Sequence, residues 1–390
     1  MNRHGIRRII AEREEELPSS EFVKILKIAE EDSDIISLGP GEPDFTTPKN
    51  IIAVAKKKLD QGFTHYTPLG GRSDTKEAIA KKLKKENKID VDPENQIIVT
   101  VGAKEAIHLS LMSLLDPGEA ALIPDPGYMP YRAMAETITV EPLSVQLKME
   151  DGFEYDIDEI KRAMEPKETK VMILNSPSNP TGTVLSKKKL EEIADFAIDN
   201  SIVIISDEAY EKFVYDGAKH VSIGSLNGMK DHVVSIFSFS KTYAMPGFRI
   251  GYACGPADII QAMTRLKMGT TLSTPTISQL AAIEALGGSQ ASVKKMVAEY
   301  GRRRKFMWKR LNGIGMECLK PKGAFYMFPR IPKGKHNSSM FSHSLLHKSK
   351  VLVVPGTEFG KYGEGFVRMS YATSYEKIVM AMERLEKVLK

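Results

Sequence analysis

The stretch SIFSFSKTYAMPGFRIGYACG, residues 235–255, places one lysine between two apolar segments. Both segments are rich enough in apolar and β-forming residues to be buried strands, so we expect Lys241 to emerge inside the molecule. Burial disfavours an ammonium ion and lowers the pKa of the amine, which makes a neutral nucleophile available for a Schiff base. A lysine that is not flanked by such apolar segments more commonly lies at the solvated surface.

The neighbours of Lys241 strengthen the prediction. Ser238 and Ser240 supply two hydroxyls and Arg249 supplies a guanidinium, and together these groups suit a phosphate monoester beside the amine. The combination indicates a phosphorylated aldehyde as the cofactor.

The segment SFSKTYAMPGFRIGY, residues 238–252, resembles the Schiff-base lysine motif of the aspartate aminotransferase family, the fold-type I enzymes that use pyridoxal 5′-phosphate (PLP). Further landmarks of that family follow in the expected order from about residue 36 to the C-terminus. The resemblance implies an α/β fold: a large domain with a mostly parallel seven-stranded sheet between helices, and a smaller α+β domain.

Composition agrees with a globular enzyme of two domains. The chain has 390 residues, 42% of them apolar, and a formal net charge of only +5 that is spread over mixed-sign helix faces. This balance argues against nucleic-acid binding. Cys254 and Cys318 form no CxxC pair, so neither a disulfide framework nor a metal site is expected, and a reducing cytoplasm fits. We expect no signal peptide and no membrane span.

Short apolar runs alternate with amphipathic helical patterns between about residues 95 and 255. This alternation predicts a mostly parallel sheet with helices on both faces and ligands at the carboxyl ends of its strands. The predicted strands are QIIVTV, AALIP, TKVMILN, SIVIISD, HVVSIFSFS and RIGYACG; IHLSLMSLL and KKKLEEIADFAIDN are among the predicted helices.

The ends of the chain have a different, α+β pattern. A long polar helix is predicted near VKKMVAEYGRRRKFMWKRLN, followed by the apolar segments GAFYMFPRI, VLVVPG and FVRMSYA. By resemblance, residues 1–45 join the small domain, residues 46–285 form the large PLP-binding domain, and residues 286–390 form the C-terminal small domain.

Residues 97–115 predict a strand, a glycine and a helix that begins near Ala103. Free N–H groups and the positive dipole end of such a helix attract anions, and Gly102 allows close approach of the backbone. Many α/β turns share this pattern. By resemblance, Gly102, Ala103 and Lys104 form the phosphate-binding turn of the family.

Asp207 ends the apolar run SIVIISD, where a buried carboxylate is costly unless it meets a cation. A protonated pyridine nitrogen is such a cation, and Tyr210 is placed to donate to the ring oxygen. From the residues alone, a helix-capping aspartate and a core tyrosine fit as well. The resemblance implies the cofactor roles. It also implies that Asn179, in NSPSNPTG, contacts the ring hydroxyl and that Tyr128, in PDPGY, stacks on the ring.

Arg368 lies in the apolar run FVRMSYA, where a bidentate carboxylate is the matching partner and a structural ion pair is the alternative. It resembles the family arginine that grips the substrate α-carboxylate, which the backbone of Gly41 also contacts. Tyr66 corresponds to a tyrosine that reaches a phosphate in the neighbouring subunit. The resemblance therefore implies a homodimer with active sites at the interface.

The resemblance implies a ping-pong transfer of an amino group between an L-amino acid and a 2-oxo acid, with Lys241 as general base and acid. Lys104 occupies the position that contacts the distal carboxylate in some aspartate aminotransferases, which favours aspartate with glutamate and 2-oxoglutarate as the partner couple. An exposed lysine at a helix start is the alternative. Aromatic amino acids and LL-diaminopimelate are alternative substrates, and a PLP-dependent lyase on the same fold is a remoter one.

Overall fold

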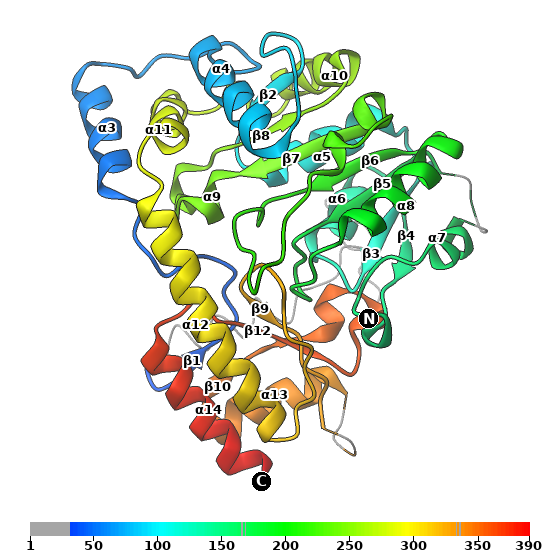
Figure 1. Cartoon of the computed structure of the whole chain (residues 1–390), viewed down its shortest axis with the longest axis vertical. Helices are drawn as coiled ribbons and strands as arrows, with labels where there is room; N and C mark the ends of the chain where they lie inside the picture. The colour runs from blue at the N-terminus through cyan, green and yellow to red at the C-terminus, as the bar shows by residue number, and fades with distance from the viewer. Residues whose placement is uncertain (1–31, 165–166, 168, 333, 335–336) are drawn as a thin grey trace, which may run out of the picture.

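The computed structural model describes residues 32–164, 167, 169–332, 334 and 337–390 (Figure 1). Within this part of the chain the largest feature is a seven-stranded sheet with the order β2-β8-β7-β6-β5-β3-β4. Only β8 runs antiparallel to its neighbours. The strands are β2 (Ile97–Thr100), β3 (Ala120–Asp125), β4 (Glu141–Gln146), β5 (Val171–Asn175), β6 (Val203–Asp207), β7 (Val233–Ser238) and β8 (Gly251–Cys254).

The six apolar runs predicted as strands are confirmed, and so is the mostly parallel sheet of seven strands. The sequence EPLSVQ of β4 was not among the predicted strands. It forms the edge of the sheet and alternates exposed or half-buried residues with the buried Leu143 and Val145. An edge strand needs no continuous apolar run, and a proline is tolerated there.

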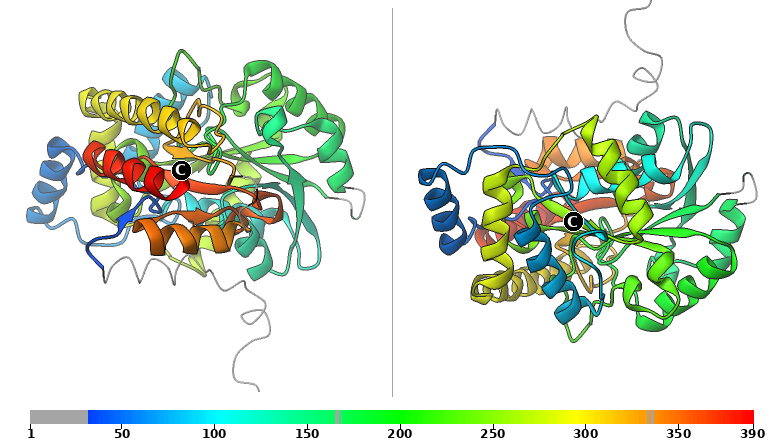
Figure 2. Two further views of the ribbon diagram at one scale, coloured as in Figure 1. Left: turned by 90° about the horizontal axis from the view of Figure 1, so that it is seen from below. Right: turned by 90° about the horizontal axis from the view of Figure 1, so that it is seen from above.

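Helices cover both faces of the sheet, as Figure 2 shows. Successive residues of a strand point to opposite faces, so Ile173 packs with one helical layer while Met172 and Leu174 pack with the other. The first layer contains α5 (Ala103–Leu114), α6 (Pro130–Thr137) and α10 (Ala257–Met268), and the second contains α7 (Ile157–Met164) and α8 (Lys187–Asp199). Near the β2 edge pack α3 (Lys49–Asp60), α4 (Ser73–Lys82) and α11 (Thr276–Gly287).

The remaining elements gather at the other end of the molecule (Figure 1). The long α12 (Ala291–Gly313) runs into this region beside α14 (Tyr375–Leu389), and α13 (Ser338–Ser349) packs against α14. A three-stranded antiparallel sheet there consists of β11 (Val354–Pro355), β12 (Val367–Ser370) and β9 (Tyr326–Met327). Finally, β1 (Ile36–Ser37) pairs in parallel with β10 (Val351–Leu352).

The β1–β10 pairing ties residues near the start of the described chain to its C-terminal part. The predicted domain limits remain a prediction, and residues 1–31 of the predicted N-terminal segment lie outside the described residues. None of the helices in the described ranges is long and apolar enough to cross a membrane.

Candidate active site

A cavity of about 440 Å³ opens at the carboxyl ends of β6 and β7. This is the position expected for a ligand in a sheet of parallel strands. All predicted site residues except Tyr66 line it. They are Gly41, Gly102, Ala103, Lys104, Tyr128, Asn179, Asp207, Tyr210, Ser238, Ser240, Lys241, Arg249 and Arg368.

Lys241 reaches the cavity from the short helix α9 (Phe239–Thr242), which directly follows β7. Ser238 caps this helix by accepting a hydrogen bond from the backbone N–H of Ser240 at 3.2 Å. The Lys241 Nζ donates to the backbone carbonyl of Gly41 at 2.5 Å. Burial lowers the pKa of Lys241 to about 8, and the nearby positive charge of Arg368 adds to this shift. At neutral pH the amine is therefore still mostly protonated, but its neutral fraction is far larger than that of an ordinary lysine.

Asp207 ends β6 and is only 5% exposed. Its carboxylate accepts hydrogen bonds from the Tyr131 hydroxyl at 2.6 Å and from the Ala209 backbone N–H at 3.1 Å. Burial nevertheless raises the pKa of Asp207. Among the described residues no cationic side chain forms an ion pair with it, so a cation in the cavity would relieve the cost of burying this carboxylate.

Arg368 projects from β12 and is 4% exposed. Its guanidinium donates to Asn179 Oδ1 at 3.0 Å and to the carbonyl of Gly39 at 2.6 Å. The Nε is buried and has no hydrogen-bond partner within the described ranges. No carboxylate there pairs with Arg368, which disfavours the structural ion pair and leaves the guanidinium available for an anionic ligand.

The part of the cavity that Gly102 and Arg249 line also suits an anion. Helix α5 begins at Ala103, as predicted, and the preceding Gly102 has a φ of +83°. A backbone with this positive φ is one that glycine adopts without strain, and the absence of a Cβ also leaves room for a terminal nitrogen of Arg249, which would lie 2.9 Å from a Cβ added there. Arg249 is exposed, donates to the carbonyl of Pro246 at 2.9 Å and forms no ion pair with a carboxylate in the described part of the chain.

Comparison with known proteins identifies the family. The model of the family "Aminotransferase class I and II" matches residues 33–385. The chain belongs to the class I and II aminotransferases.

Individual relatives agree with this assignment. The aspartate aminotransferase of Pyrococcus abyssi is 48% identical over 373 residues, which cover 95% of this chain and 96% of that protein. The aromatic-amino-acid aminotransferase 2 of Thermococcus litoralis is 45% identical over 383 residues, 98% of each chain. A solved structure of the Thermus thermophilus aspartate aminotransferase with maleate matches with a TM-score of 0.93 at 36% identity and covers 98% of this chain and 100% of that one. The predicted family and the fold-type I architecture are thus confirmed.

Two tyrosines of this aminotransferase belong to the site but were not predicted. Tyr131, on α6, holds Asp207, and it is 1% exposed. Tyr326, on β9, lines the cavity, and its hydroxyl lies 2.7 Å from that of Tyr210. The Arg368 guanidinium also lies 4.6 Å from the centre of the Tyr326 ring. In sequence, both tyrosines look like ordinary core aromatics.

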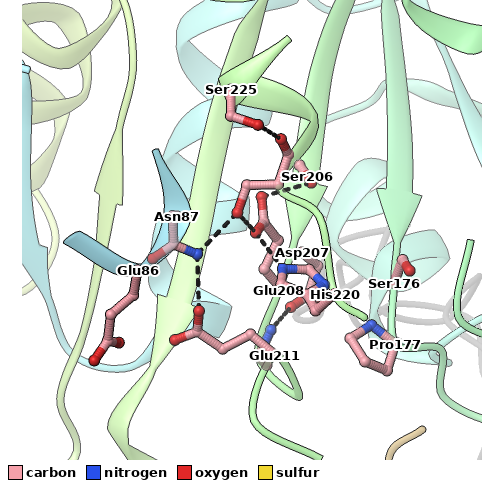
Figure 3. A network of polar contacts seen from close by, with 12 residues as sticks. Glu86, Asn87, Ser176, Pro177, Ser206, Asp207, Glu208, Glu211, His220 and Ser225 are labelled. Carbon is pink, nitrogen blue, oxygen red and sulfur yellow. Dashed lines mark hydrogen bonds and ion pairs between the residues drawn. The ribbon is translucent and has the colours of Figure 1, made fainter. Parts of the chain in front are cut away.

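A buried polar network adjoins Asp207 in the aminotransferase and begins at the next residue, Glu208 (Figure 3). The neighbouring Glu208 is 1% exposed and its carboxylate bonds to His220 Nε2 at 2.8 Å, to Ser206 at 3.1 Å and to Ser222. Asn87 connects Ser222 to Glu211, each at 2.8 Å, and Lys82 pairs with Glu211. Burial alone would raise the pKa of Glu211, but the charges of Lys82 and Lys212 lower it to about 2. The network anchors Glu208 and Glu211, which are the residues directly after Asp207 and Tyr210 in sequence.

The aminotransferase has a larger cavity, of about 900 Å³, beside the first. Lys104, Tyr128, Met129 and Pro130 line both cavities. Lys241 and Asp207 do not line the larger one, so the reactive groups belong to the smaller cavity. Tyr66 lines neither and is 84% exposed, so its predicted role toward a neighbouring subunit stays a prediction.

Proposed function

We propose that this aminotransferase uses PLP to exchange an α-amino group between aspartate and 2-oxo acids, with glutamate and 2-oxoglutarate as the partner couple. The observation that carries the proposal is the complementary set of charges in one cavity. Arg368 is a buried guanidinium without a carboxylate among the described residues, Asp207 is a buried carboxylate without a cation there, and Lys241 is an amine with a pKa of about 8. A carboxylate substrate and a pyridinium cofactor would supply the missing partners.

The residues of the cavity fit PLP at both of its ends. At the phosphate end, the turn formed by Gly102, Ala103 and Lys104 offers free backbone N–H groups, and Ser238, Ser240 and Arg249 add hydroxyls and a charge. At the ring end, Asp207 would face the pyridine nitrogen, Tyr210 and Asn179 the ring hydroxyl, and Tyr128 the ring face. When bound, PLP would supply an aldehyde that captures the substrate amine and a ring that delocalises negative charge.

The chain itself would position the substrate and move one proton. Arg368, Asn179 and the backbone of Gly41 would hold the α-carboxylate, so that the Cα–H bond has one orientation. Lys241 Nζ would take the proton from Cα as general base and deliver it to the C4′ carbon of the cofactor as general acid. Its lowered pKa suits both tasks because the amine and ammonium forms interconvert readily near pH 8. Asp207 would stay ionised and hold a proton on the facing nitrogen.

Lys104 supports an acidic substrate. It lies at the start of α5, is exposed and lines both cavities, so its ammonium can meet the distal carboxylate of aspartate where the cavities join. Relatives named aspartate aminotransferases support the same choice. An aromatic amino acid is the second candidate, favoured by the 45% identical aromatic-amino-acid aminotransferase 2. LL-diaminopimelate is a third candidate substrate, and a PLP-dependent lyase reaction on the same fold is a remoter candidate.

We further propose a homodimer in which Tyr66 contacts the phosphate of the neighbouring site. Its 84% exposure in the single chain is what such a role requires.

The large domain would span residues 46–285, with residues 1–45 and 286–390 in the small domain. A cytoplasmic location is supported by the two cysteines, Cys254 and Cys318, which are buried and free.

The proposal can be tested by mixing the PLP-loaded protein with single amino acids and recording its visible absorbance. Aspartate and glutamate should change the spectrum at lower concentrations than tyrosine or LL-diaminopimelate. Lys104→Ala should weaken the response to aspartate by about 10-fold and leave the response to tyrosine within about 2-fold. A stronger response to tyrosine or LL-diaminopimelate in the unmodified protein would overturn the assignment of aspartate.

A further inference from the structure

Glu105 brings a negative charge into the turn that the proposed function assigns to a phosphate. It is the third residue of α5, and its carboxylate accepts a hydrogen bond from the backbone N–H of Val101 at 2.5 Å. This hydrogen bond joins the residues before and after Gly102 and so fixes the shape of the turn. A carboxylate in the first turn of an isolated helix is favourable, but it competes with a second anion at the same helix end.

Lys267 compensates this charge from a different helix. It lies near the end of α10, its side chain is fully buried, and its ammonium donates to Glu105 at 2.8 Å and to the Thr271 hydroxyl at 2.9 Å. Thr271 also donates to the second carboxylate oxygen of Glu105. The Glu105 carboxylate is therefore held by the backbone N–H of Val101 in its own turn, and by an ammonium and a hydroxyl from the segment 267–271 at the end of α10.

We propose that Lys267 is a positioning residue for the phosphate group of the cofactor: by pairing with Glu105 it neutralises the carboxylate that shapes the turn 101–104, so that a phosphate dianion can bind there. This inference rests on the proposed function. Lys267 does not line the cavity, so it would not contact the cofactor directly. It acts through Glu105, and its removal would leave that largely buried carboxylate without a cationic partner beside the anion site.

A role toward the phosphate can be told apart from a merely structural role by comparing cofactors with and without a phosphate. Pyridoxal shares the ring and aldehyde of PLP but lacks the phosphate. In cofactor-free protein, Lys267→Met should weaken the binding of PLP by about 10- to 100-fold and that of pyridoxal by less than about 3-fold. In the double variant Glu105→Gln/Lys267→Met, the binding of PLP should return to within about 5-fold of the unmodified protein, since the uncompensated charge is gone.

Lys82→Met is the matched control. Lys82 is also a buried lysine paired with a glutamate, Glu211, but its network lies behind Asp207 at the ring end of the cavity. Its replacement should therefore affect PLP and pyridoxal by the same factor. Dissociation constants can be measured by the quenching of protein fluorescence, with circular dichroism as the check of folding.

Equal weakening of PLP and pyridoxal by Lys267→Met, or no weakening of PLP, would overturn the inference. If Lys267→Met does not fold, Glu105→Gln decides, because it keeps an acceptor for the Val101 N–H and removes the charge. PLP should then bind about 3- to 10-fold more tightly with pyridoxal unchanged. Unchanged or weaker binding of PLP would contradict the proposal. Failure of the unmodified protein to bind PLP would instead reject the proposed function.

Discussion

The hydroxyl of Tyr131 donates a 2.6 Å hydrogen bond to Oδ2 of Asp207, although 76 positions separate the two residues in sequence. This bond favours the ionised carboxylate and so opposes the rise in pKa that burial causes. Asp207 has to remain ionised to keep a pyridine nitrogen protonated. Tyr131 therefore supports the electronic role of the proposed cofactor from outside the cavity.

Replacing Tyr131 by phenylalanine should raise the pKa of Asp207, because burial remains while the stabilising bond is lost. Hydrogen bonds to charged groups contribute about 1.5–3 kcal/mol, so a shift of about one pH unit or more is expected. Protonation of Asp207 would then occur at a higher pH, so the acid limb of the pH profile of kcat/KM should shift to higher pH.

Tyr155→Phe is the control for this prediction. Its hydroxyl is also buried but bonds at 3.3 Å to the carbonyl of Ile173 and to the backbone N–H of Asn175 instead of Asp207. The acid limb should stay in place in this variant. A limb that moves equally in both variants would show that Tyr131 has no specific effect on Asp207.

Arg368→Lys should be far from conservative, since a lysine cannot form the two parallel bonds of a guanidinium with a carboxylate. We expect kcat/KM for amino acids to fall by about 100-fold or more, equivalent to about 3 kcal/mol, with the binding of PLP itself little changed. Arg330→Lys serves as control, because that arginine is partly exposed and pairs with Glu150. A loss below about 5-fold at Arg368 would argue against its contact with the substrate.

The lowered pKa of Lys241 predicts how the cofactor-free protein captures PLP. Burial and the charge of Arg368 favour the neutral amine, so the capture rate should rise with pH through about 8 and then level off. An ordinary lysine would respond near pH 10.4. Stopped-flow absorbance measures this rate, and Lys241→Ala should give no product. A midpoint near 10 would contradict the role of burial.

Gly41 should tolerate no side chain. A Cβ there would lie 2.6 Å from the hydroxyl oxygen of Tyr326, so Gly41→Ala has to displace either the ring or the backbone that receives Lys241. We expect kcat/KM to fall by about 10- to 100-fold. The double variant Gly41→Ala/Tyr326→Phe removes the clashing oxygen and should recover part of the loss. If kcat/KM does not recover in the double variant, the loss in Gly41→Ala does not come from a clash with the Tyr326 hydroxyl.

The parts of the fold and site that the sequence predicted share a physical reason. Apolar runs such as VMILN and VIISD form the buried centre of the sheet, and the polar residue at the end of the second run, Asp207, comes to the cavity because parallel strands end at one edge. The edge strand β4 escaped prediction because half-exposed positions interrupt its apolar pattern.

Tyr131 and Tyr326 show where prediction from sequence stops. Both are almost completely buried and lie among apolar neighbours, which is typical of core aromatics. What distinguishes them is a hydroxyl that meets Asp207 or Tyr210 across long sequence separations. Such contacts depend on how the elements pack, and no local pattern records them. The pair of Glu105 and Lys267, from α5 and α10, is of the same kind.

The most direct test of the proposed function is a single half-reaction. The PLP-loaded protein is mixed with excess aspartate and no 2-oxo acid, and the oxaloacetate formed is counted per chain. A transaminase should release one equivalent per chain and stop, and then turn over continuously when 2-oxoglutarate is added, with Lys241→Ala inactive throughout. Continuous release of a keto acid without an acceptor would indicate a lyase, and no release would contradict aspartate as the substrate.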